Sequence, residues 1–529
     1  MAVEIGLHWL QIEQPFPKFD APITEHHKGV MRMRVLNWGK IASGFFVSML
    51  AGCGGGHGGG YGSMTPAPTT PAPAMPAPTI SFSQPAAAAT INFGQAVTVA
   101  WTSANATSCT AKTSSAAGGA FTGTQMMSGS KTVVPTAPGT YTYSLSCTGT
   151  GGTQSASASA TVAPNLLSTL APTGAIPTVG STIDPTNGDL NPYGLTIAPA
   201  TAGSITKGDL VVCNFNDGPT NTQGLGTTII ALHPAAGSTP RRIAQSANLK
   251  GCNALAMLPD DSISAAAWGA NLNPLVSASG AVGAPFASDL FTNPWGEAFV
   301  AATATQPAAI YVSNAPGTAI NAGGAIDRIS LDVDAQTAFT EIAAGFCSSG
   351  SPGAIFGPSG LTYDASNDTL YIIDTSSASV IALTGVSAIP KNGVVVNGQC
   401  SGTATPTPVP TFSGPSMASA RVVAHGSPLN TPLSAALLKN GDLVVGNADI
   451  GAAGPSATTN LLIEVSPVLP GGFVGKPLQI DTGAPGTLFG IAATVDSQGN
   501  QIIYFNDDNN NAVMQLGPVT MGTAPGGGY

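Results

Sequence analysis

The chain has 529 residues, of which 8% are charged, and its formal net charge is −10. Beyond residue 52 it keeps 11 of its 16 basic residues and 22 of its 26 acidic residues. Nucleic-acid binding needs a basic patch, so this acidic chain with scattered lysines and arginines is not expected to bind nucleic acid. The hydrophobic content of 43%, arranged in short β-branched runs, predicts folded β-structure rather than disorder.

The N-terminal part of the chain has the layout of an export signal. Within residues 31–52, basic residues precede a short apolar run at 41–51 that ends in small residues. This is the pattern of a secretory signal peptide, and the run is shorter than the roughly 20 residues of a membrane span. Residues 1–30 do not fit the front of such a signal. We interpret them as a non-native upstream extension, with the start at Met31 or Met33.

The apolar run leads into Leu-Ala-Gly-Cys at residues 50–53, which resembles the lipobox of bacterial lipoproteins. In that family the cysteine is diacylated and becomes the first mature residue. The resemblance therefore implies a lipid anchor on Cys53, a membrane as partner and the cell envelope as location. Gly54, where a retention signal would have aspartate, favours the outer membrane by resemblance to sorting in enteric bacteria.

Residues 53–78 predict a tether that holds the folded parts away from the membrane. The stretch 54–62 is rich in glycine and should be flexible, whereas 65–78 repeats Pro-Ala and Pro-Thr and should be extended.

Residues 79–163 predict a β-sandwich of short strands separated by Gly, Pro, Ser and Asn clusters. The expected strands lie at 79–82, 96–101, 131–134, 140–147 and 155–162. The stretch from Trp101 to Cys109, together with Gly-Thr-Tyr-Thr-Tyr at 139–143 and Cys147, resembles bacterial Ig-like domains. That resemblance implies a Cys109–Cys147 disulfide and a spacer or adhesive role, and it carries over no catalytic residue.

Residues 164–517 repeat a loose pattern in which an opening strand is followed by a second strand near a turn. The six openings lie at 191–195, 252–255, 293–297, 357–361, 432–436 and 488–491. Second strands are expected at 208–212, 368–372, 441–445 and 499–503, and third strands at 228–232, 380–383, 461–465 and 512–516. Repeats of a few strands at this spacing predict a propeller or a similar array.

The stretches 374–383 and 507–516 resemble the turn and third strand of NHL-type propeller repeats. We predict an all-β fold, an Ig-like sandwich followed by a β-propeller with six blades, although the irregular spacing also allows five or seven. A flat sandwich array explains the recurring openings less well. The last blade lacks an outer strand, and 166–179 is the candidate that closes it. Residues 518–529 are expected to be a disordered tail.

The six cysteines other than Cys53 predict disulfides in an oxidising compartment, although buried free thiols are the alternative. Six thiols allow 15 full pairings. Nearness in the repeat order favours two pairs within the propeller, Cys213–Cys252 and Cys347–Cys400. Beyond Cys53 the only histidines are His57, His233 and His425, so a zinc site is not expected.

Candidate ligand-binding residues lie at the blade openings, which should surround the mouth of the channel. They are three aromatic residues and three asparagines, namely Tyr193, Trp295, Phe489, Asn191, Asn253 and Asn293. Aromatic rings and amides around a concavity suit a small molecule or a glycan. The plainer interpretation, which we favour, is that the aromatics plug the channel and the asparagines cap turns.

The function expected from the sequence is a non-catalytic binding or interaction module, with a small molecule, a glycan or a protein as ligand and no cofactor. The alternative is a metal-dependent propeller hydrolase of the lactonase type, in which Glu297 would be the acidic ligand of a divalent metal. The pair Asp507-Asp508 is a weaker candidate for calcium, because it lacks the spaced Asp-x-Asp-x-Asp-Gly pattern.

Overall fold

The computed structural model describes residues 74–518 apart from 87–88, 287–288, 318–320, 332–336, 352–353, 398–399, 401–407 and 470. The expected signal peptide, Cys53, most of the tether and residues 519–529 lie outside the described residues. Within the described ranges, no helix is long and apolar enough to span a membrane. The helices found there are α1 (Leu166–Leu170) and the single 3-10 turns η1 (Ala116–Gly118), η2 (Ala247–Leu249), η3 (Val386–Ala388) and η4 (Met417–Ser419).

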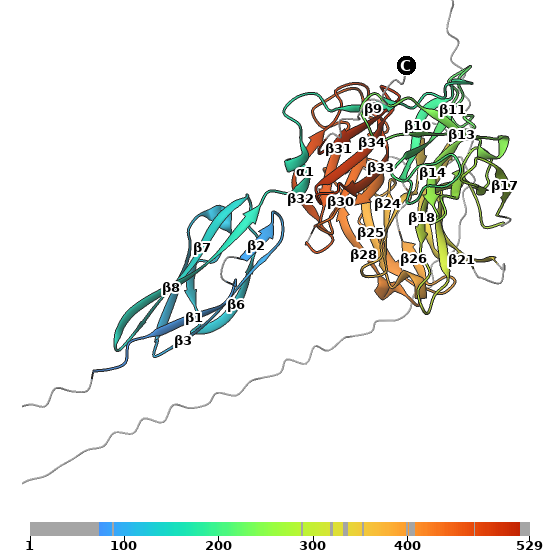
Figure 1. The fold of residues 1–529 in the computed structure, drawn as a ribbon. Coiled ribbons are helices and arrows are strands. Elements are labelled where there is room, and N and C mark those ends of the chain that lie inside the picture. Colours follow the sequence, from blue (N-terminus) through green and yellow to red (C-terminus); the bar gives the residue numbers. More distant parts are fainter. Residues whose placement is uncertain are drawn as a thin grey trace, which may run out of the picture. The chain divides into compact units, whose positions relative to one another are not determined.

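The described chain begins with two β-sheets that share one core (Figure 1). One sheet has the order β1-β3-β6, with β1 (Thr79–Gln84), β3 (Val97–Ala104) and β6 (Ser128–Val133). The other has the order β2-β8-β7-β4-β5, with β2 (Ala89–Asn92), β4 (Ser108–Thr113), β5 (Gly123–Gln125), β7 (Gly139–Gly149) and β8 (Gly152–Ala163). The two sheets form a β-sandwich.

Alternating side chains build the core of this sandwich, as the period of two in a strand requires. Val99 and Trp101 of β3 face Tyr143 and Leu145 of β7, and all four are at most 4% exposed. The buried polar atoms of the aromatic residues find backbone partners. The Trp101 indole N–H donates to the Met126 carbonyl at 3.0 Å, and the Tyr143 hydroxyl donates to a carbonyl at 2.9 Å.

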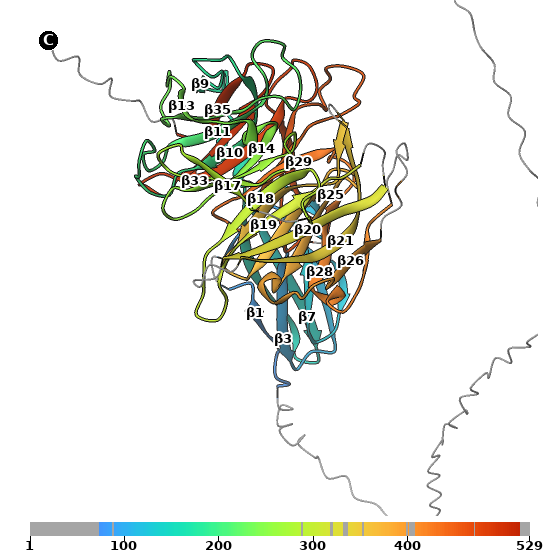
Figure 2. The ribbon, with the colours of Figure 1, turned by 90° about the vertical axis from the view of Figure 1, so that its right-hand side faces the viewer.

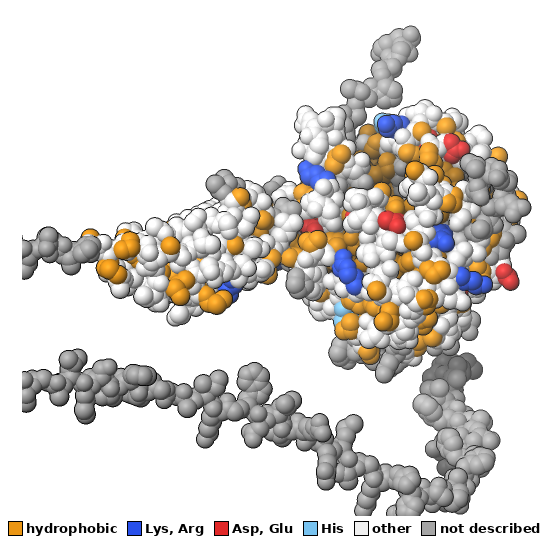
Figure 3. All heavy atoms as spheres, turned by 90° about the horizontal axis from the view of Figure 1, so that it is seen from below, with side chains coloured by type: hydrophobic (Ala, Val, Ile, Leu, Met, Phe, Trp, Pro, Cys, Tyr) orange, Lys and Arg blue, Asp and Glu red, His pale blue; other side chains and the backbone are white. Residues whose placement is uncertain are grey.

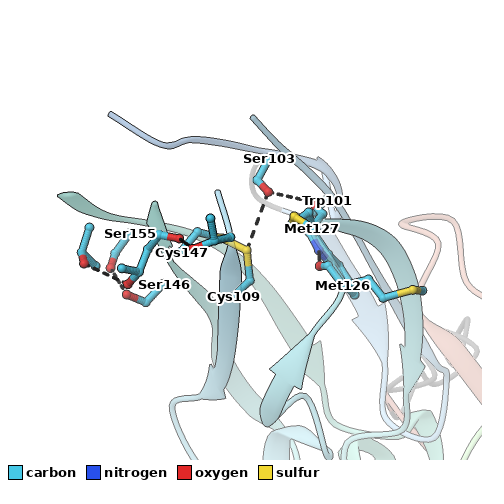
Figure 4. The surroundings of a disulfide bond; sticks show 11 residues. Trp101, Ser103, Cys109, Met126, Met127, Ser146, Cys147 and Ser155 are labelled. Atoms are coloured by element: carbon cyan, nitrogen blue, oxygen red, sulfur yellow. Dashed lines mark hydrogen bonds between the residues drawn. A yellow bond between two sulfur atoms is a disulfide. The ribbon is translucent and has the colours of Figure 1, made fainter. Parts of the chain in front are cut away.

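The disulfide of this sandwich joins Cys109 of β4 to Cys147 of β7 (Figure 4). The two cysteines lie directly opposite each other in the β4–β7 pairing, with their Cα atoms 4.1 Å apart. The bridge therefore links neighbouring strands of one sheet rather than the two sheets. The Ser103 hydroxyl lies 3.7 Å from the Cys109 sulfur and donates to the Met127 carbonyl at 2.7 Å.

From residue 178 onward, the described chain forms six antiparallel sheets, each built on four strands. The first is β10 (Leu190–Ile197), β11 (Leu210–Asn216), β12 (Thr228–Leu232) and β13 (Arg241–Gln245). The second is β14 (Cys252–Met257), β15 (Ile263–Ala267), β16 (Pro274–Val276) and β17 (Val282–Pro285). The third is β18 (Pro294–Val300), β19 (Ala308–Asn314), β20 (Asn321–Leu331) and β21 (Thr337–Ser351).

The remaining three sheets repeat the arrangement. The fourth is β23 (Pro358–Asp364), β24 (Thr369–Asp374), β25 (Ser379–Thr384) and β28 (Ala420–His425). The fifth is β29 (Pro432–Leu437), β30 (Leu443–Asn447), β31 (Leu461–Val465) and β32 (Phe473–Gln479). The sixth is β33 (Leu488–Val495), β34 (Gln501–Asp507), β35 (Ala512–Leu516) and β9 (Thr178–Ser181).

The first strands of these sheets form a closed ring. Each of β10, β14, β18, β23, β29 and β33 contacts the next, and β33 contacts β10 again. Buried aliphatic side chains fill the space between successive sheets, as in the cluster that joins the first sheet to the second. A closed ring of four-stranded sheets is a β-propeller, which removes all but short sheet edges.

The sixth sheet takes its fourth strand from the other end of the propeller. Strand β9 pairs antiparallel with β35, with Ser181 opposite Ala512 and Gly180 opposite Val513. Of the expected closing segment 166–179, only residues 178–179 belong to a strand, β9. Residues 166–170 form the helix α1 instead. The backbone N–H groups of Leu166 and Leu167 donate to the Glu464 carboxylate at 3.2 and 2.6 Å, which satisfies the start of that helix.

An insertion between β25 and β28 of the fourth sheet extends the third sheet. Its strands β26 (Val394–Asn397) and β27 (Thr411–Ser413) form a hairpin, and β26 pairs in parallel with β21. Figure 2 shows β18 to β21 and β26 side by side. A short strand β22 (Ala354–Phe356) also pairs with β21. The hairpin explains why Cys347 and Cys400 meet, since Cys347 lies on β21 and Cys400 lies in the hairpin, after the strand β26 that pairs with β21.

The propeller contains two disulfides. Cys213 of β11 is bonded to Cys252, the first residue of β14, and this bond links the first sheet to the second. Cys347 of β21 is bonded to Cys400, which follows β26. The expectation that the cysteines form disulfides is therefore confirmed within the described residues.

Candidate functional site

All six sheets share an irregularity at the start of the first strand. The pairing of first and second strands shifts register there in each sheet. Such a bulge bends a strand and re-aims its side chains. The shifts coincide with the openings seen in the sequence, and the residues at the equivalent position are Tyr193, Asn253, Trp295, Ser359, Leu433 and Phe489.

Four of these bulges continue with a glycine, and the packing explains why. A Cβ at Gly296 would lie 1.9 Å from the Ser359 carbonyl oxygen, and one at Gly490 would lie 2.4 Å from the Tyr193 carbonyl oxygen. In both cases the obstacle is the backbone of the next first strand. Glycine therefore permits the close approach that brings the neighbouring bulge residues together.

The structure brings the three predicted aromatic residues into contact. The Tyr193 ring stacks on Phe489 with centroids 3.8 Å apart and on Phe215 with centroids 4.1 Å apart. Trp295 meets Tyr193 edge to face at 5.8 Å, and Trp268 packs against Phe215 at 5.7 Å. We call these five residues the aromatic cluster. Burial of Tyr193 in it raises the pKa of its hydroxyl.

A cavity of about 270 Å³, which we call the mouth cavity, lies on one side of the aromatic cluster. The bulge residues Tyr193, Trp295, Leu433 and Phe489 form part of its wall. Turns that follow the second strands of the first, fifth and sixth sheets contribute the polar residues Gln223, Asp449 and Asp508. Asn191 of β10 and the segment before β33 complete the wall.

A second cavity of about 80 Å³, the channel cavity, is lined by residues of all six first strands and so lies on the axis of the ring. The four bulge residues that line the mouth cavity also line this one. They therefore lie between the two spaces and close the channel. The structure thus places the three predicted aromatic residues, Tyr193, Trp295 and Phe489, between the two cavities.

Glu297 of β18 lines the channel cavity and is 6% exposed. Its Oε1 accepts a hydrogen bond from Ser264 of β15 at 3.0 Å, on the neighbouring second sheet. Its Oε2 is buried without a hydrogen-bond partner. Burial raises the pKa of Glu297 to about 8, although the hydrogen bond from Ser264 opposes the shift.

The three predicted asparagines lie in three different places. Asn191 lines the mouth cavity, with its Oδ1 buried and unpartnered. Asn253 lines the channel cavity, and both of its side-chain polar atoms are buried without a partner. Asn293 lines neither cavity; its φ is 55°, and its backbone N–H donates to Asn271 Oδ1 at 2.6 Å. Asn293 is therefore placed as a turn residue.

Phe215, Trp268, Gln223 and Asp449 also belong to the aromatic cluster or to the mouth cavity, although they were not predicted from the sequence. A pattern that points to Asp449 is the recurrence of Asn and Asp at the end of second strands, as at 216–217, 447–449 and 506–508. Of the proposed calcium pair, Asp507 accepts the Thr487 hydroxyl at 2.7 Å and two hydrogen bonds from Asn510, whereas Asp508 lines the mouth cavity. The carboxylates of this pair thus face different surroundings.

His233, His425 and the arginine doublet lie away from both cavities. His233 faces Asp209 at 3.4 Å, and His425 ends β28, where its Nδ1 lies 3.0 Å from the Ser379 hydroxyl. Arg241 pairs with Asp209 and Arg242 with Asp184. On the face of the molecule in Figure 3, charged side chains are scattered singly among polar and apolar ones.

A donor set for a divalent metal is not assembled around Glu297. It is the only carboxylate that lines the channel cavity, and Asn253 adds one further side-chain oxygen. Ca²⁺ takes six to eight oxygen ligands, so these two donors fall short of that number. Among the described residues, no group of three or more His, Cys, Asp or Glu side chains is placed to hold a metal ion.

No protein-family model and no curated protein matches this chain. Solved structures of β-propeller proteins are similar to it at low identity. A regucalcin from Agrobacterium tumefaciens, described as a calcium-binding protein, is 15% identical, with 65% of this chain and 96% of that chain covered and a TM-score of 0.39. A virginiamycin B lyase from Staphylococcus aureus is 14% identical, with 63% and 97% covered and a TM-score of 0.35. At these values the function must be argued from the residues of this chain.

Proposed function

We propose that this protein is a cell-envelope lipoprotein whose propeller is a non-catalytic binding module, and that the mouth cavity is its binding site. The observation that supports the proposal is the wall of this cavity. It combines aromatic rings with polar groups that have no protein partner, such as Asn191 Oδ1. Ligand sites are mostly apolar concavities with a few placed polar groups, and about 270 Å³ suits a small ligand or the end of a larger one.

Each of the six sheets would be one blade, and the NHL-like turns of the fourth and sixth sheets agree with a propeller of that type. We further propose that the sandwich is Ig-like. Its Tyr141 hydroxyl donates to the Ala137 carbonyl at 2.8 Å, four residues upstream, as in a tyrosine corner. The Cys109–Cys147 bridge departs from the immunoglobulin pattern, which links the two sheets.

The binding proposal is tested by thermal shift of the mature chain against a collection of small molecules and glycans. A ligand that occupies the mouth cavity should raise the melting temperature, and Gln223→Ala should weaken this shift because Gln223 lines the cavity while being exposed. The matched control is Gln498→Ala, an exposed glutamine in the β33–β34 turn. A collection that produces no shift, or shifts equal in both variants, would contradict the proposal.

The anchor on Cys53 is a separate part of the proposal. Wild-type protein should fractionate with membranes, should be labelled by palmitate and should accumulate as a precursor under globomycin. Cys53→Ser should abolish the label and release the protein from the membrane fraction. A Cys53→Ser protein that stays with the membranes would contradict the anchor, and density-gradient separation tests the expected outer-membrane location.

The alternative function, a metal-dependent hydrolase of the lactonase type, has one observation in its favour. The unpartnered Oε2 of Glu297 and the unpartnered amide of Asn253 line the same channel cavity. If this function were correct, metal analysis would find a divalent ion that Glu297→Gln removes, and the wild type would hydrolyse lactones. Absence of both from the purified protein would leave the binding module as the better proposal.

A further inference from the structure

The mouth cavity has an unbalanced set of charges. Asp449 and Asp508 contribute carboxylates to its wall, and none of the residues that line it is Lys, Arg or His. A cavity of this kind repels anions and attracts cations. The sign of the charge is therefore one property of the ligand that the lining residues specify.

The two carboxylates differ in what they bind. Asp449 is 1% exposed and accepts hydrogen bonds from the Asn430 side chain at 2.9 Å and from the Asn460 backbone at 2.6 Å. Asp508 is half-buried, and no other described residue donates a hydrogen bond to its carboxylate or forms an ion pair with it. Asp508 is thus the carboxylate that is available to a ligand.

Two further features of the wall favour an organic cation. Trp295 and Phe489 line the cavity with aromatic rings, and a ring face attracts a cation that lies within about 6 Å of its centre. Tyr193 also lines the cavity, but Phe215 and Phe489 stack on its two faces. Asn191 is 4% exposed, and its unpartnered Oδ1 is an additional acceptor in the same wall. A metal ion would not need the aromatic surface, whereas an alkylated ammonium group would use both the rings and the carboxylate.

We propose that the mouth cavity binds a small organic cation, with an ammonium group held by Asp508 and by the aromatic rings of Trp295 and Phe489. This inference rests on the proposed binding function and adds the chemical class of the ligand. A neutral sugar, which would also stack on aromatic rings, is the competing class that the experiment must separate.

Binding of such a cation should depend on pH. Burial raises the pKa of Asp508 to about 7, and the neighbouring Asp507 charge adds to the shift. The other titratable groups around it are Tyr193 on β10, Asp449 in the same wall and Asp481, which accepts from Asn509. A cation favours the ionised carboxylate, so affinity should rise as the pH passes upward through about 7.

The test is calorimetric titration of the mature chain with choline and with 3,3-dimethylbutan-1-ol, its neutral isostere in which carbon replaces the ammonium nitrogen. Choline should bind at least about tenfold more tightly, as desolvated cation–π and carboxylate contacts imply. Asp508→Asn should remove about that factor, whereas Asp260→Asn, an exposed carboxylate on the turn after β14, should leave the affinity unchanged. Thermal melting of both variants shows that they are folded.

Three outcomes would overturn the inference: equal affinity for the two isosteres, an unchanged choline affinity in Asp508→Asn, or binding of methyl glucoside in preference to choline. The last outcome would leave the binding function intact while removing the cation. If no probe binds and no thermal shift depends on Gln223, both the inference and the proposed function fail.

Discussion

At the scale of single residues, the buried polar side chains of the propeller fall into two groups. Most have partners that keep them in place, as Asp184 does with Arg242 and with two backbone amides. Fourteen described residues carry a buried side-chain polar atom without a partner, and three of them, Asn191, Asn253 and Glu297, line the two cavities. A buried polar atom without a partner costs free energy, so its position at a cavity is informative.

Glu297 should make the stability of the protein depend on pH. Its carboxyl ionises near pH 4.5 in the unfolded chain and near pH 8 in the folded protein. Between these values only the folded state holds the proton, so stability falls as pH rises from about 4.5 to about 8, by at most about 1.4 kcal/mol per pH unit. Glu297→Gln cannot titrate and should gain stability relative to the wild type across this window.

Denaturant unfolding at a series of pH values measures this difference for Glu297→Gln. Asp260→Asn serves as the control because its side chain is exposed. Stability curves for Glu297→Gln and wild type that run parallel from pH 5 to pH 8 would show that Glu297 is not buried as described.

Arg242→Gln should destabilise the first sheet, because it leaves the buried Asp184 carboxylate without its cationic partner. The Arg242 Nε–H donates to Asp184 at 2.9 Å, and Asp184 is 2% exposed. Burial alone would raise the pKa of Asp184, but the hydrogen bond from Arg242 and those from two backbone amides lower it. The ionised Asp184 carboxylate therefore stabilises the folded state above about pH 4, and this stabilisation is lost as the pH falls through the lowered pKa of Asp184.

Breaking such a pair costs about 3 kcal/mol, which denaturant unfolding of Arg242→Gln at pH 7 would detect. Arg421→Gln, at an exposed arginine of β28, should change stability by less than about 0.5 kcal/mol. Similar effects of the two substitutions would mean that the Arg242 pair is no more than a surface contact.

At the scale of single strands, the bulged opening is the unit that builds both the ring and the site. The glycine of the bulge sets the distance between first strands, and in three of the four cases the residue before it, Tyr193, Trp295 or Phe489, lines the channel cavity. Side chains of the second strands hold the arrangement, since Ser313 of β19 donates to the Ser359 carbonyl at 2.8 Å and Asn506 of β34 donates to the Tyr193 carbonyl at 3.1 Å.

Gly296→Ala should therefore disturb the ring even though it adds only a methyl group. The new Cβ would lie 1.9 Å from the Ser359 carbonyl oxygen, and backbone cannot move aside as a flexible side chain does. We expect a loss of about 3 kcal/mol in unfolding free energy. Gly174→Ala, where a Cβ meets nothing within 4 Å, is the matched control and should be close to neutral. Equal stability of the two variants would refute this account of the openings.

The local pattern of the sequence was sufficient to predict the openings of the first strands and three of the five residues of the aromatic cluster. Both could be predicted because the bulge recurs with recognisable Pro, aromatic and Gly positions. It was not sufficient for Phe215 and Trp268, which reach the cluster from a second strand and from the turn after one. Nor could it place β26 and β27, since the choice of a partner in another sheet depends on contacts distant in the sequence. Asp508 was recognised as acidic, but its cavity exists only in the assembled ring.

At the scale of the whole molecule, the pairing of β9 with β35 joins segments more than 330 residues apart. The packing at the closure is aliphatic, like that between the other sheets. Val179 of β9 lies in the same hydrophobic cluster as Leu210 and Val513. It does make the first and last sheets depend on each other. Pairings of such long range are slow to form, so closure is expected late in folding.

Val179→Asp tests this dependence. Val179 is 1% exposed, and a carboxylate there has no described partner in the cluster that it enters. We expect a loss of about 3 kcal/mol or more and a faster rate of unfolding. The control is Val495→Asp, because Val495 is 46% exposed at the end of β33. If Val179→Asp unfolds no faster than the control, β9 does not hold the ring closed.

The hairpin of β26 and β27 is expected to determine which sheets of the ring unfold locally as one unit. Its strands leave the fourth sheet after β25, pair with β21 of the third sheet, and return to β28. The Cys347–Cys400 bond ties the outgoing strand to β21. The third and fourth sheets therefore form one cooperative unit for amide hydrogen exchange, whereas the fifth sheet, which exchanges no strand with a neighbour, is expected to exchange its amides independently.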